Sequence, residues 1–199
     1  MFEVIDFIGI IAFAISGILV GIRHNLDLLG LFIASFLTAL GGGIMRDIIV
    51  DKTPYSFTHN TPAIIVLIAI IAIITLRPYK KKNIENSKIF ILSDSLGLSS
   101  FSISGALLAI ESNFNITGIL TVSFISAVGG GIVRDIIINE VPLIFKTGFY
   151  GTISLLIGLI IYCLDIFDFI NIYTLFLTLL LGTSIRVIAY YKAWNLPKI

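Results

Sequence analysis

Two ten-residue stretches place three consecutive glycines and an Arg-Asp pair inside otherwise apolar sequence. Residues 41–50 read GGGIMRDIIV, and residues 129–138 read GGGIVRDIII. A charge within an apolar span is energetically unfavourable, faces protein or water, and marks a functional site by default. Three glycines each weaken a helix by roughly 1 kcal/mol relative to alanine. They also let backbone carbonyls face a cavity, so both motifs predict a kink or break that lines a polar path.

Close helix packing is the alternative explanation for these glycines, because small residues let two backbones approach. Two glycine runs at matched positions, each followed by Arg-Asp, favour the path. Thr38 and Ser126 precede the glycines by one turn and are weaker candidates for lining it. The candidate pathway glycines are Gly41, Gly42, Gly43, Gly129, Gly130 and Gly131.

The Arg-Asp pairs lie about one turn beyond the glycines. Neighbours in sequence sit about 100° apart on a helix, so we expect the two members of a pair not to face each other. Each therefore needs another partner, and we predict the contacts Asp6–Arg46 and Asp94–Arg134. The alternative is that these charges only cap helix ends or reach the lipid headgroups. The charged candidates are Arg46, Asp47, Arg134, Asp135, Asp6 and Asp94.

A second motif, Phe-x-Ile-Ser-Gly, occurs at residues 13–17 and 101–105. It places Ser16 and Ser104 at midplane depth in their apolar segments. Their hydroxyls could serve a permeating ion or substrate, or the carbonyls of a broken helix. A serine bonded to its own helix backbone is equally common. The sequence leaves these alternatives open.

The composition limits the class of protein that carries these motifs. Of 199 residues, 57% are hydrophobic and 13% are charged, whereas soluble domains carry about 25% charge. The mean hydropathy is +1.07, which excludes a soluble enzyme. The net charge of +1 argues against a nucleic-acid binder, which would show a basic stripe. His24 and His59 are isolated, and no Walker or G-x-S-x-G motif occurs, so we expect no metal site, no cofactor and no enzymatic activity.

Seven apolar segments must position these residues. All must be helical, because lipid offers the backbone no other partner. We therefore predict an all-α integral membrane protein with seven transmembrane helices. The third segment is short, about 22 Å against a hydrocarbon core of about 30 Å. The segments run near Val4–Ile22, Leu28–Val50, Pro62–Leu76, Ile89–Ile110, Ile116–Ile138, Thr147–Leu164 and Phe169–Tyr190.

Both motifs recur at one offset of 88 residues, and so do Gly30 with Gly118 and Pro54 with Pro142. Each copy holds three segments. Because three is odd, the second copy enters the membrane from the opposite face, which makes an inverted-topology repeat. We expect a single membrane domain over residues 1–199, with repeats at about 1–79 and 88–165 and an extra helix at about 169–190.

The loop charges predict the orientation. Basic residues gather in the loops on the side opposite the N-terminus, whereas Lys52 is the one lysine on the N-terminal side. The positive-inside rule then places the N-terminus outside and the C-terminus in the cytoplasm. The Lys80-Lys81-Lys82 cluster is most simply part of this signal, and binding of anionic lipid is its alternative. Acidic Glu3 and Asp6 argue against a cleaved signal peptide.

The doubled GGGxxRD, with Phe-x-Ile-Ser-Gly before it, resembles the prokaryotic trimeric intracellular cation (TRIC) channels. This bacterial and archaeal group is also labelled the "glycine transporter" domain repeat. The resemblance covers the first six segments, and the seventh also fits. It implies homotrimers in a prokaryotic plasma membrane, with one pore per protomer between the repeats. It also implies that the second and fifth spans kink at the glycines and line the pore, with potassium or sodium as the permeant ion.

The same resemblance places Arg46, Asp47, Arg134, Asp135, Ser16 and Ser104 on or near the path. Membrane lipids are further implied partners, and a bound lipid is compatible with the resemblance. Animal members carry a basic lipid-binding motif after the glycines of the second span. This chain has Ile44-Met45-Arg46-Asp47 there, so phosphoinositide control does not transfer.

A potassium-permeable cation channel is the leading interpretation. Carbonyls and hydroxyls would replace part of the hydration shell of the ion. Arg46 and Arg134 must then be neutralised by aspartate or act as movable gates. A secondary transporter for a small solute such as glycine is the alternative, because inverted repeats are typical of such carriers. A membrane scaffold would explain the small residues but not the duplicated charges.

Overall fold

The structure is a computed structural model that describes residues 2–76, 87–146 and 149–194. Within these ranges the chain forms nine helices and no strands. Five are long and apolar enough to cross a membrane: α1 (Phe2–Arg23), α2 (Leu28–Ile49), α5 (Lys88–Glu111), α6 (Ile116–Ile137) and α9 (Ile172–Tyr191). Two apolar helices are shorter, α4 (Thr61–Leu76) and α8 (Gly151–Ile166). The other two have four residues each, α3 (Tyr55–Thr58) and α7 (Leu143–Lys146).

Side-chain caps and left-handed residues set the helix boundaries. Asp27 accepts a hydrogen bond from Gly30 N at 2.7 Å at the start of α2. Asn115 does the same for Gly118 N at 2.9 Å at the start of α6. Asparagine and aspartate are among the few residues that tolerate a positive φ after a helix end. They do so here at Asn25, Asp51, Asn113, Asn139 and Asp168.

The structure corrects two boundaries and adds two elements. The seventh apolar segment was expected from Phe169, but α9 begins at Ile172 because Asn171 forms a capping box with Thr174. The sixth was expected from Thr147, yet α8 begins at Gly151. The hydropathy pattern did not predict α3 and α7. Thr147, Arg77, the Lys80-Lys81-Lys82 cluster and Lys198 lie outside the described residues.

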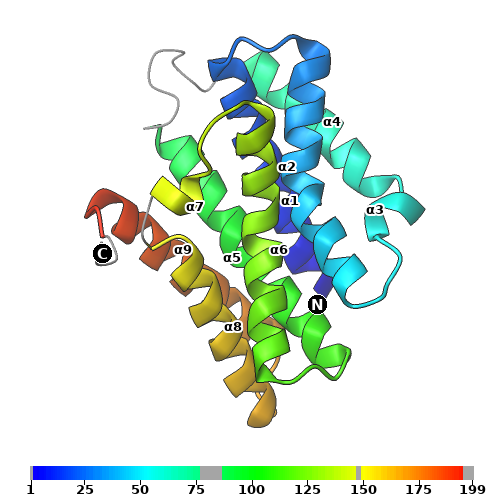
Figure 1. Cartoon of the computed structure of the whole chain (residues 1–199), viewed down its shortest axis with the longest axis vertical. Coiled ribbons are helices and arrows are strands. Elements are labelled where there is room, and N and C mark those ends of the chain that lie inside the picture. The colour runs from blue at the N-terminus through cyan, green and yellow to red at the C-terminus, as the bar shows by residue number, and fades with distance from the viewer. Residues whose placement is uncertain (1, 77–86, 147–148, 195–199) are drawn as a thin grey trace.

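The long helices of the two halves of the chain pack against each other in matched pairs. α1 lies against α5, and α2 lies against α6. Within each half, α1 packs on α2 and α4, and α5 packs on α6 and α8. Figure 1 shows α2 and α6 side by side and running in opposite directions. α9 packs on α5 and α8, and no described helix occupies the matching position on α1.

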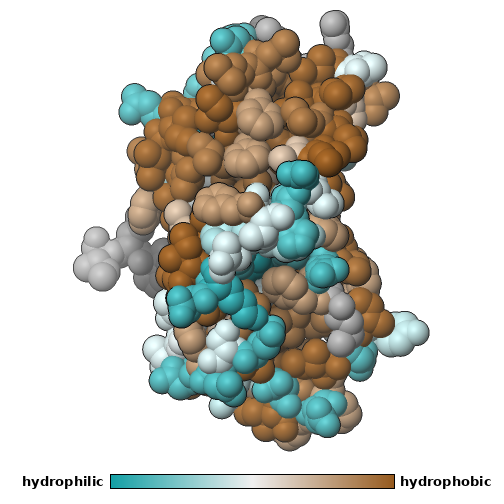
Figure 2. All heavy atoms as spheres, turned by 90° about the vertical axis from the view of Figure 1, so that its right-hand side faces the viewer, coloured by the Kyte–Doolittle hydropathy of each residue, from teal (hydrophilic) through white to brown (hydrophobic). Residues whose placement is uncertain are grey.

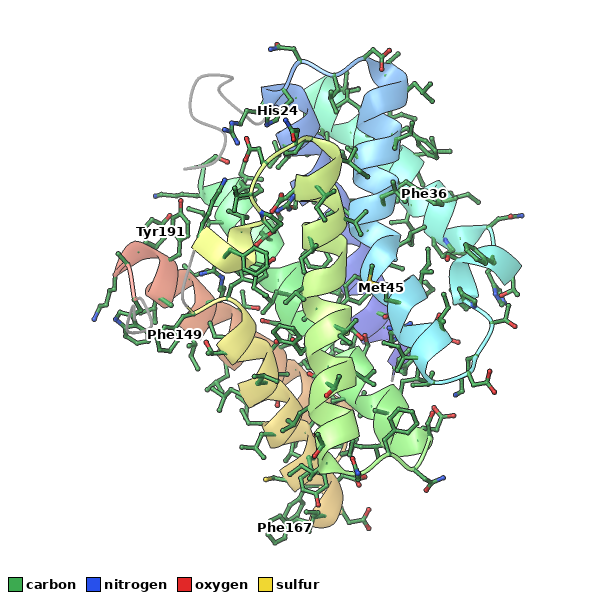
Figure 3. All side chains as sticks on the ribbon, in the orientation of Figure 1. His24, Phe36, Met45, Phe149, Phe167 and Tyr191 are labelled. Carbon is green, nitrogen blue, oxygen red and sulfur yellow. The ribbon has the colours of Figure 1, made fainter. Side chains whose placement is uncertain are left out.

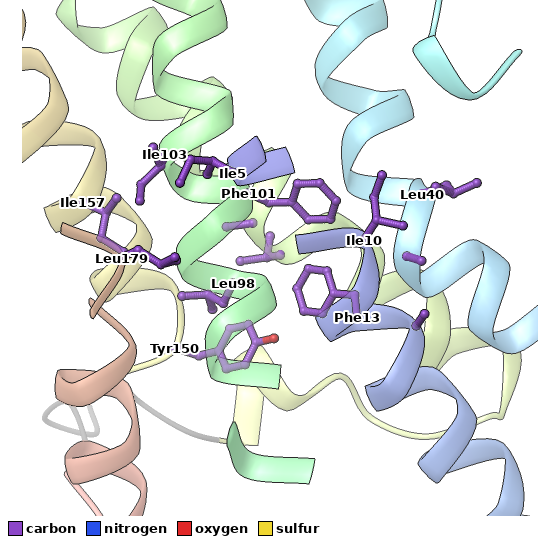
Figure 4. Close-up of a cluster of buried hydrophobic side chains, with 14 of the residues drawn as sticks. Ile5, Ile10, Phe13, Leu40, Leu98, Phe101, Ile103, Tyr150, Ile157 and Leu179 are labelled. Atoms are coloured by element: carbon purple, nitrogen blue, oxygen red, sulfur yellow. The ribbon is translucent and has the colours of Figure 1, made fainter. Parts of the chain in front are cut away.

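The two phenylalanines of the Phe-x-Ile-Ser-Gly motifs meet in the core. The rings of Phe13 and Phe101 lie 5.4 Å apart, and both side chains are buried (Figure 4). Large apolar side chains also cover much of the outside, as Ile68 and Ile71 of α4 illustrate with 60% and 65% exposure. On the face that carries α3 and α4, hydrophobic surface fills the upper part and hydrophilic groups gather lower down (Figure 2). Such an apolar exterior suits a lipid environment.

Candidate functional site

A buried arginine organises a first charged cluster, here called the Arg46 cluster. Arg46 is 1% exposed, and its Nη1 contacts Asp6 Oδ1 of α1. The same Nη1 donates to Ser104 Oγ of α5 at 2.8 Å. Nε donates to Asp47 Oδ1 at 2.9 Å, and the ring of Phe2 lies 4.9 Å from the guanidinium carbon. Three long helices therefore converge on one guanidinium.

A second cluster, the Arg134 cluster, repeats this arrangement 88 residues later. Arg134 Nη1 donates to Asp94 Oδ1 at 3.0 Å and to Ser16 Oγ at 2.6 Å. Nε donates to Asp135 Oδ1 at 2.8 Å, and the Phe90 ring lies 5.5 Å from the guanidinium carbon. In both clusters the serine comes from the other half of the chain. Each half therefore completes the polar site of its counterpart.

Both predicted contacts, Asp6–Arg46 and Asp94–Arg134, are present in these clusters. Both guanidinium groups are buried, which does not fit the headgroup alternative. The expectation that neighbouring Arg and Asp do not face each other was wrong. The long arginine side chain folds back along its helix, so its Nε reaches the next residue although the two Cβ atoms diverge.

The second carboxylate oxygens of Asp47 and Asp135 have a role that the sequence interpretation missed. Asp47 Oδ2 accepts the backbone N–H of Tyr55 at 3.0 Å, and Asp135 Oδ2 accepts that of Leu143 at 2.8 Å. These carboxylates thereby tie the first residues of α3 and α7 to the arginine clusters. The contacts of Phe2 and Phe90 were missed as well. Both could have been found, because these phenylalanines also match at the offset of 88.

The polar residues predicted near the path divide into two groups. Ser16 and Ser104 accept from the arginine of the opposite half, which was not among the expected alternatives. Ser104 also donates to Phe101 O of its own helix at 3.4 Å, as one of those alternatives proposed. Thr38 donates to its own helix at Ala34 O, 2.5 Å away, and Ser126 donates to Val122 O at 2.6 Å. Thr38 and Ser126 are fully buried and do not line a described cavity.

The six glycines lie in unbroken α-helix, so within α2 and α6 the structure has no break. Gly42 and Gly130 lie where the two helices cross. A Cβ on Gly42 would collide with the carbonyl oxygen of Ser126, and one on Gly130 would collide with that of Thr38. The middle glycines therefore serve close packing, which was the alternative interpretation. A kink at the glycines stays a prediction.

The other four glycines lie on either side of this crossing. Gly41 faces the backbone of Gly130, and Gly129 faces the Met45 sulfur, which lies between α2 and α6 (Figure 3). Gly43 and Gly131 face the guanidinium groups. A Cβ added to Gly43 would lie 3.7 Å from Arg46 Nη2, and one added to Gly131 would lie 3.9 Å from Arg134 Nη2. The third glycine of each run therefore borders the charged cluster of its own helix.

The cavities around the two clusters differ. On the side of the Arg46 cluster, here called the Arg46 end, a cavity of about 310 Å³ is lined by Phe2, Arg46, Asp47, Lys52, Thr53, Tyr55, Thr58, His59, Leu108 and Glu111. A second, smaller space of about 20 Å³ shares Arg46, Asp47 and Tyr55 with this cavity and is also lined by Gly43 and Leu40. That volume holds about one water molecule. At the matching Arg134 end, the space beside Gly131 and Val128 has no room for water.

Ion pairs join the two halves of the chain at both ends. In the Arg23–Glu140 and Lys52–Glu111 pairs, matched positions carry opposite charges. At the Arg134 end, Glu140 contacts Arg23 at 3.1 Å, His24 at 3.0 Å and Lys146 at 3.3 Å. Partial burial raises the pKa of Glu140, but these cations outweigh it and hold the pKa below its ordinary value. At the Arg46 end, the matching positions pair Lys52 with Glu111 at 3.1 Å.

The described ranges contain no group of three or more His, Cys, Asp or Glu residues that could hold a metal ion. His24 bonds Glu140 at the end of the molecule opposite Phe167 (Figure 3). His59 stacks on Tyr55, with 4.1 Å between ring centroids, and lines the cavity at the Arg46 end. The two histidines thus belong to separate groups of residues.

Comparisons with known proteins agree with this architecture. The family model described as "Glycine transporter" matches residues 3–78 and 91–165. The "UPF0126 membrane protein YvgT" of Bacillus subtilis (strain 168) is 33% identical over 98% of this chain and 95% of its own length. A solved structure from "Structural basis for conductance through TRIC cation channels" has a TM-score of 0.85 at 33% identity, covering 100% of this chain and 97% of that one. Another, "Crystal structure of a prokaryotic TRIC channel in 0.5 M KCl", has a TM-score of 0.88 at 29% identity and covers 98% of both chains.

Proposed function

Because the chain belongs to the family described as "Glycine transporter", which includes the prokaryotic TRIC channels, we propose that it is a monovalent cation channel permeable to potassium. It is an all-helical membrane protein with the TRIC channel fold. The proposal assigns potassium or sodium as the permeant ion and needs no cofactor. The charge of the two arginine clusters is the observation that carries it.

The charge of these clusters favours cations. An unpaired arginine would repel them, but Arg46 contacts both Asp6 and Asp47. One guanidinium and two carboxylates give the cluster a formal charge of −1. The Arg134 cluster has the same composition. A negative site behind a cavity raises the local concentration of cations.

The pore runs through each protomer between the two halves of the chain. α2 and α6 cross at its centre, and an arginine cluster lies on either side of the crossing. The cavity of about 310 Å³ supports this path, because it leads directly to Arg46 and Asp47. The third glycine of each run, Gly43 or Gly131, borders this path beside the guanidinium group of its own helix. The remaining predicted site residues position the two arginine clusters and the crossing of α2 and α6. They are Ser16, Ser104, Thr38, Ser126, Gly41, Gly42, Gly129 and Gly130.

The membrane arrangement that we propose has seven spans. α4 and α8 have 16 residues, or about 24 Å at 1.5 Å per residue, and they cross with help from flanking residues. The opposite directions of α2 and α6 support an inverted repeat. The basic loops support an orientation with the N-terminus outside and the C-terminus in the cytoplasm of a prokaryotic cell. In the plasma membrane the protein forms a homotrimer surrounded by lipid.

A carrier for a small solute such as glycine is the second candidate. One observation favours it: a cavity is open at the Arg46 end, whereas the matching space at the Arg134 end is closed. A carrier exposes its site to one side at a time. In that case the two clusters would form alternating halves of one substrate site.

Flux from purified protein in liposomes tests both candidates. A channel dissipates a potassium gradient rapidly and gives no saturable entry of labelled glycine. The informative variant is Asp6→Asn, which raises the formal charge of the Arg46 cluster from −1 to 0 at almost constant side-chain size. Its matched control is Asp27→Asn, an exposed position where asparagine still caps α2.

We expect Asp6→Asn to lower potassium flux and Asp27→Asn to leave it unchanged. Saturable glycine uptake without potassium flux would replace the channel with the carrier. Equal potassium flux in the two variants would remove the cluster charge from the mechanism. Thermal melting of both variants shows whether any loss of flux reflects unfolding.

A further inference from the structure

The two ends of the proposed path differ in the residues that line their small inner spaces. Seven residues that line the small space at the Arg46 end have counterparts at the Arg134 end, each 88 residues later. Four of these pairs are similar, as Gly43 with Gly131 or Leu40 with Val128. The other three differ: Tyr55 is matched by Leu143, Ser56 by Ile144 and Pro62 by Tyr150. Among these three, only the last exchange puts a large aromatic ring at the Arg134 end. The end with proline has a space of about 20 Å³, and the end with tyrosine has none.

Tyr150 fills this space. It is 2% exposed and precedes the first turn of α8. Its ring points into the core beside Leu98 (Figure 4). A Cβ added to Gly131 would lie 3.3 Å from the Tyr150 hydroxyl oxygen, so the side chain rests against the last glycine of the run. Tyr150 therefore lines the same small space as Gly131 and Val128.

An arginine from α9 holds Tyr150 in place. The guanidinium carbon of Arg186 lies 4.7 Å from the centre of the Tyr150 ring. Arg186 is 4% exposed, and a cation–π contact strengthens when it is withdrawn from water. α9 lies outside the repeated segments, and no described helix takes its place on α1. The closed end is therefore the one that α9 reaches.

The tyrosine position also leaves polar atoms unsatisfied. Within the described residues, neither the Tyr150 hydroxyl nor Arg134 Nη2 has a hydrogen-bond partner, and both atoms are buried. A buried polar atom without a partner loses the hydration that it would have in water. Moving Tyr150 aside would admit water to both atoms. The cation–π contact with Arg186 therefore stabilises the closed position of Tyr150, and the two buried polar atoms without partners destabilise it.

We infer that Tyr150 is the gate at the Arg134 end and that Arg186 is the positioning residue that keeps it closed. The inference rests on the proposed path between the two halves. Opening requires the tyrosine ring to leave the space beside Gly131 and Val128. The Arg46 end has no counterpart of this gate among the described residues.

Thiol labelling tests the gate without any need for conduction. The exposed Cys163 is first replaced by serine. Val128→Cys then places a single thiol behind Tyr150, and Leu40→Cys places the matched thiol at the open end. The protein is reconstituted, and a small, charged, membrane-impermeant thiosulfonate is applied from each side. We expect slow labelling at position 128 and faster labelling at position 40.

Tyr150→Ala should speed labelling at position 128 several-fold and leave position 40 unchanged. Arg186→Gln should do the same with the ring present, whereas Tyr150→Phe should stay slow because the ring remains. Tyr162→Ala on the same helix is the control for loss of an aromatic ring. Elution as a single folded species is required of every variant, and Arg186→Gln carries the test if Tyr150→Ala does not fold.

Unchanged labelling at position 128 in a folded Tyr150→Ala or Arg186→Gln variant would overturn the gate. Equal labelling at positions 40 and 128 in the parent would overturn it as well. Potassium flux separates this outcome from failure of the proposed function. If the parent conducts and Tyr150→Ala conducts no faster, the gate is wrong and the channel stands. If labelling responds to Tyr150→Ala but no variant conducts potassium, the gate stands and the channel is wrong.

Discussion

Alanine substitution at neighbouring glycines should have opposite effects on stability. At Gly42, a Cβ meets the carbonyl oxygen of Ser126, which is backbone and cannot turn away. Overpacking typically costs about 1–3 kcal/mol, and we take the upper value because two helix backbones must separate. Alanine regains about 1 kcal/mol of helix propensity. The expected net loss for Gly42→Ala is about 2 kcal/mol.

At Gly43 the added Cβ meets Arg46 Nη2 at 3.7 Å, an ordinary van der Waals contact. Gly43→Ala should therefore keep the propensity gain of up to about 1 kcal/mol. A chain of this length shifts its melting temperature by about 2–4 °C per kcal/mol. We expect Gly42→Ala to melt about 4–8 °C lower and Gly43→Ala to melt up to about 4 °C higher.

Thermal unfolding in detergent, followed by intrinsic fluorescence, measures these shifts. Gly130→Ala provides an independent repeat of the Gly42 measurement, because its Cβ would meet the Thr38 carbonyl. If Gly42→Ala melts with or above the parent, α2 and α6 do not cross at this glycine. If Gly43→Ala falls as far as Gly42→Ala, the glycines matter for a reason other than the crossing.

Two further substitutions test the arginine clusters, and a third tests the ion pairs of Glu140. Ser104→Ala removes the hydroxyl that accepts a hydrogen bond from Arg46. Because hydrogen bonds to charged groups contribute about 1.5–3 kcal/mol, the melting temperature should fall. An unchanged melting temperature would show that water replaces the serine. Asp135→Asn removes the carboxylate charge that accepts from Arg134 Nε while Asp94 still pairs with Arg134, so the melting temperature should fall by the loss of one hydrogen bond between charged groups, about 1.5–3 kcal/mol. Exposed Asp168→Asn should be neutral in the same melting assay, and equal shifts would contradict the pairing. Glu140 has a folded-state pKa below its ordinary value, so its stabilisation is present above the unfolded-state pKa and disappears as pH falls through the folded-state pKa. Glu140→Gln should therefore lose less stability than the parent below about pH 4.3, and parallel melting curves across that window would refute the ion-pair effect.

The sequence predicted the features that depend on repetition and hydropathy. The offset of 88 residues showed which segments correspond to each other. These segments had to be helical because lipid offers the backbone no hydrogen-bond partners. The pairing of Asp6 with Arg46 followed because both were assigned to the same end of adjacent spans. Helix ends shifted by a few residues where polar caps such as Asn171 outweighed apolar neighbours.

Side-chain reach and crossing geometry could not be predicted in the same way. The position of Arg46 on a helical wheel does not show that its guanidinium folds back to Asp47. Spacing also could not show that Ser104 of one half bonds the arginine of the other half, because the offset relates equivalent residues and not contacting ones. The different roles of Gly42 and Gly43 depend on where α2 meets α6. That meeting point is a property of the packed bundle.

The exchange of serines between the clusters has a consequence for mutational tolerance. Duplicated segments often suggest redundancy, in which one copy buffers damage to the other. Here Arg46 depends on Ser104, and Arg134 depends on Ser16. The two halves are therefore complementary and not interchangeable, and damage to either one impairs the polar site of both. Separately expressed halves should restore a complete molecule only when they are made together.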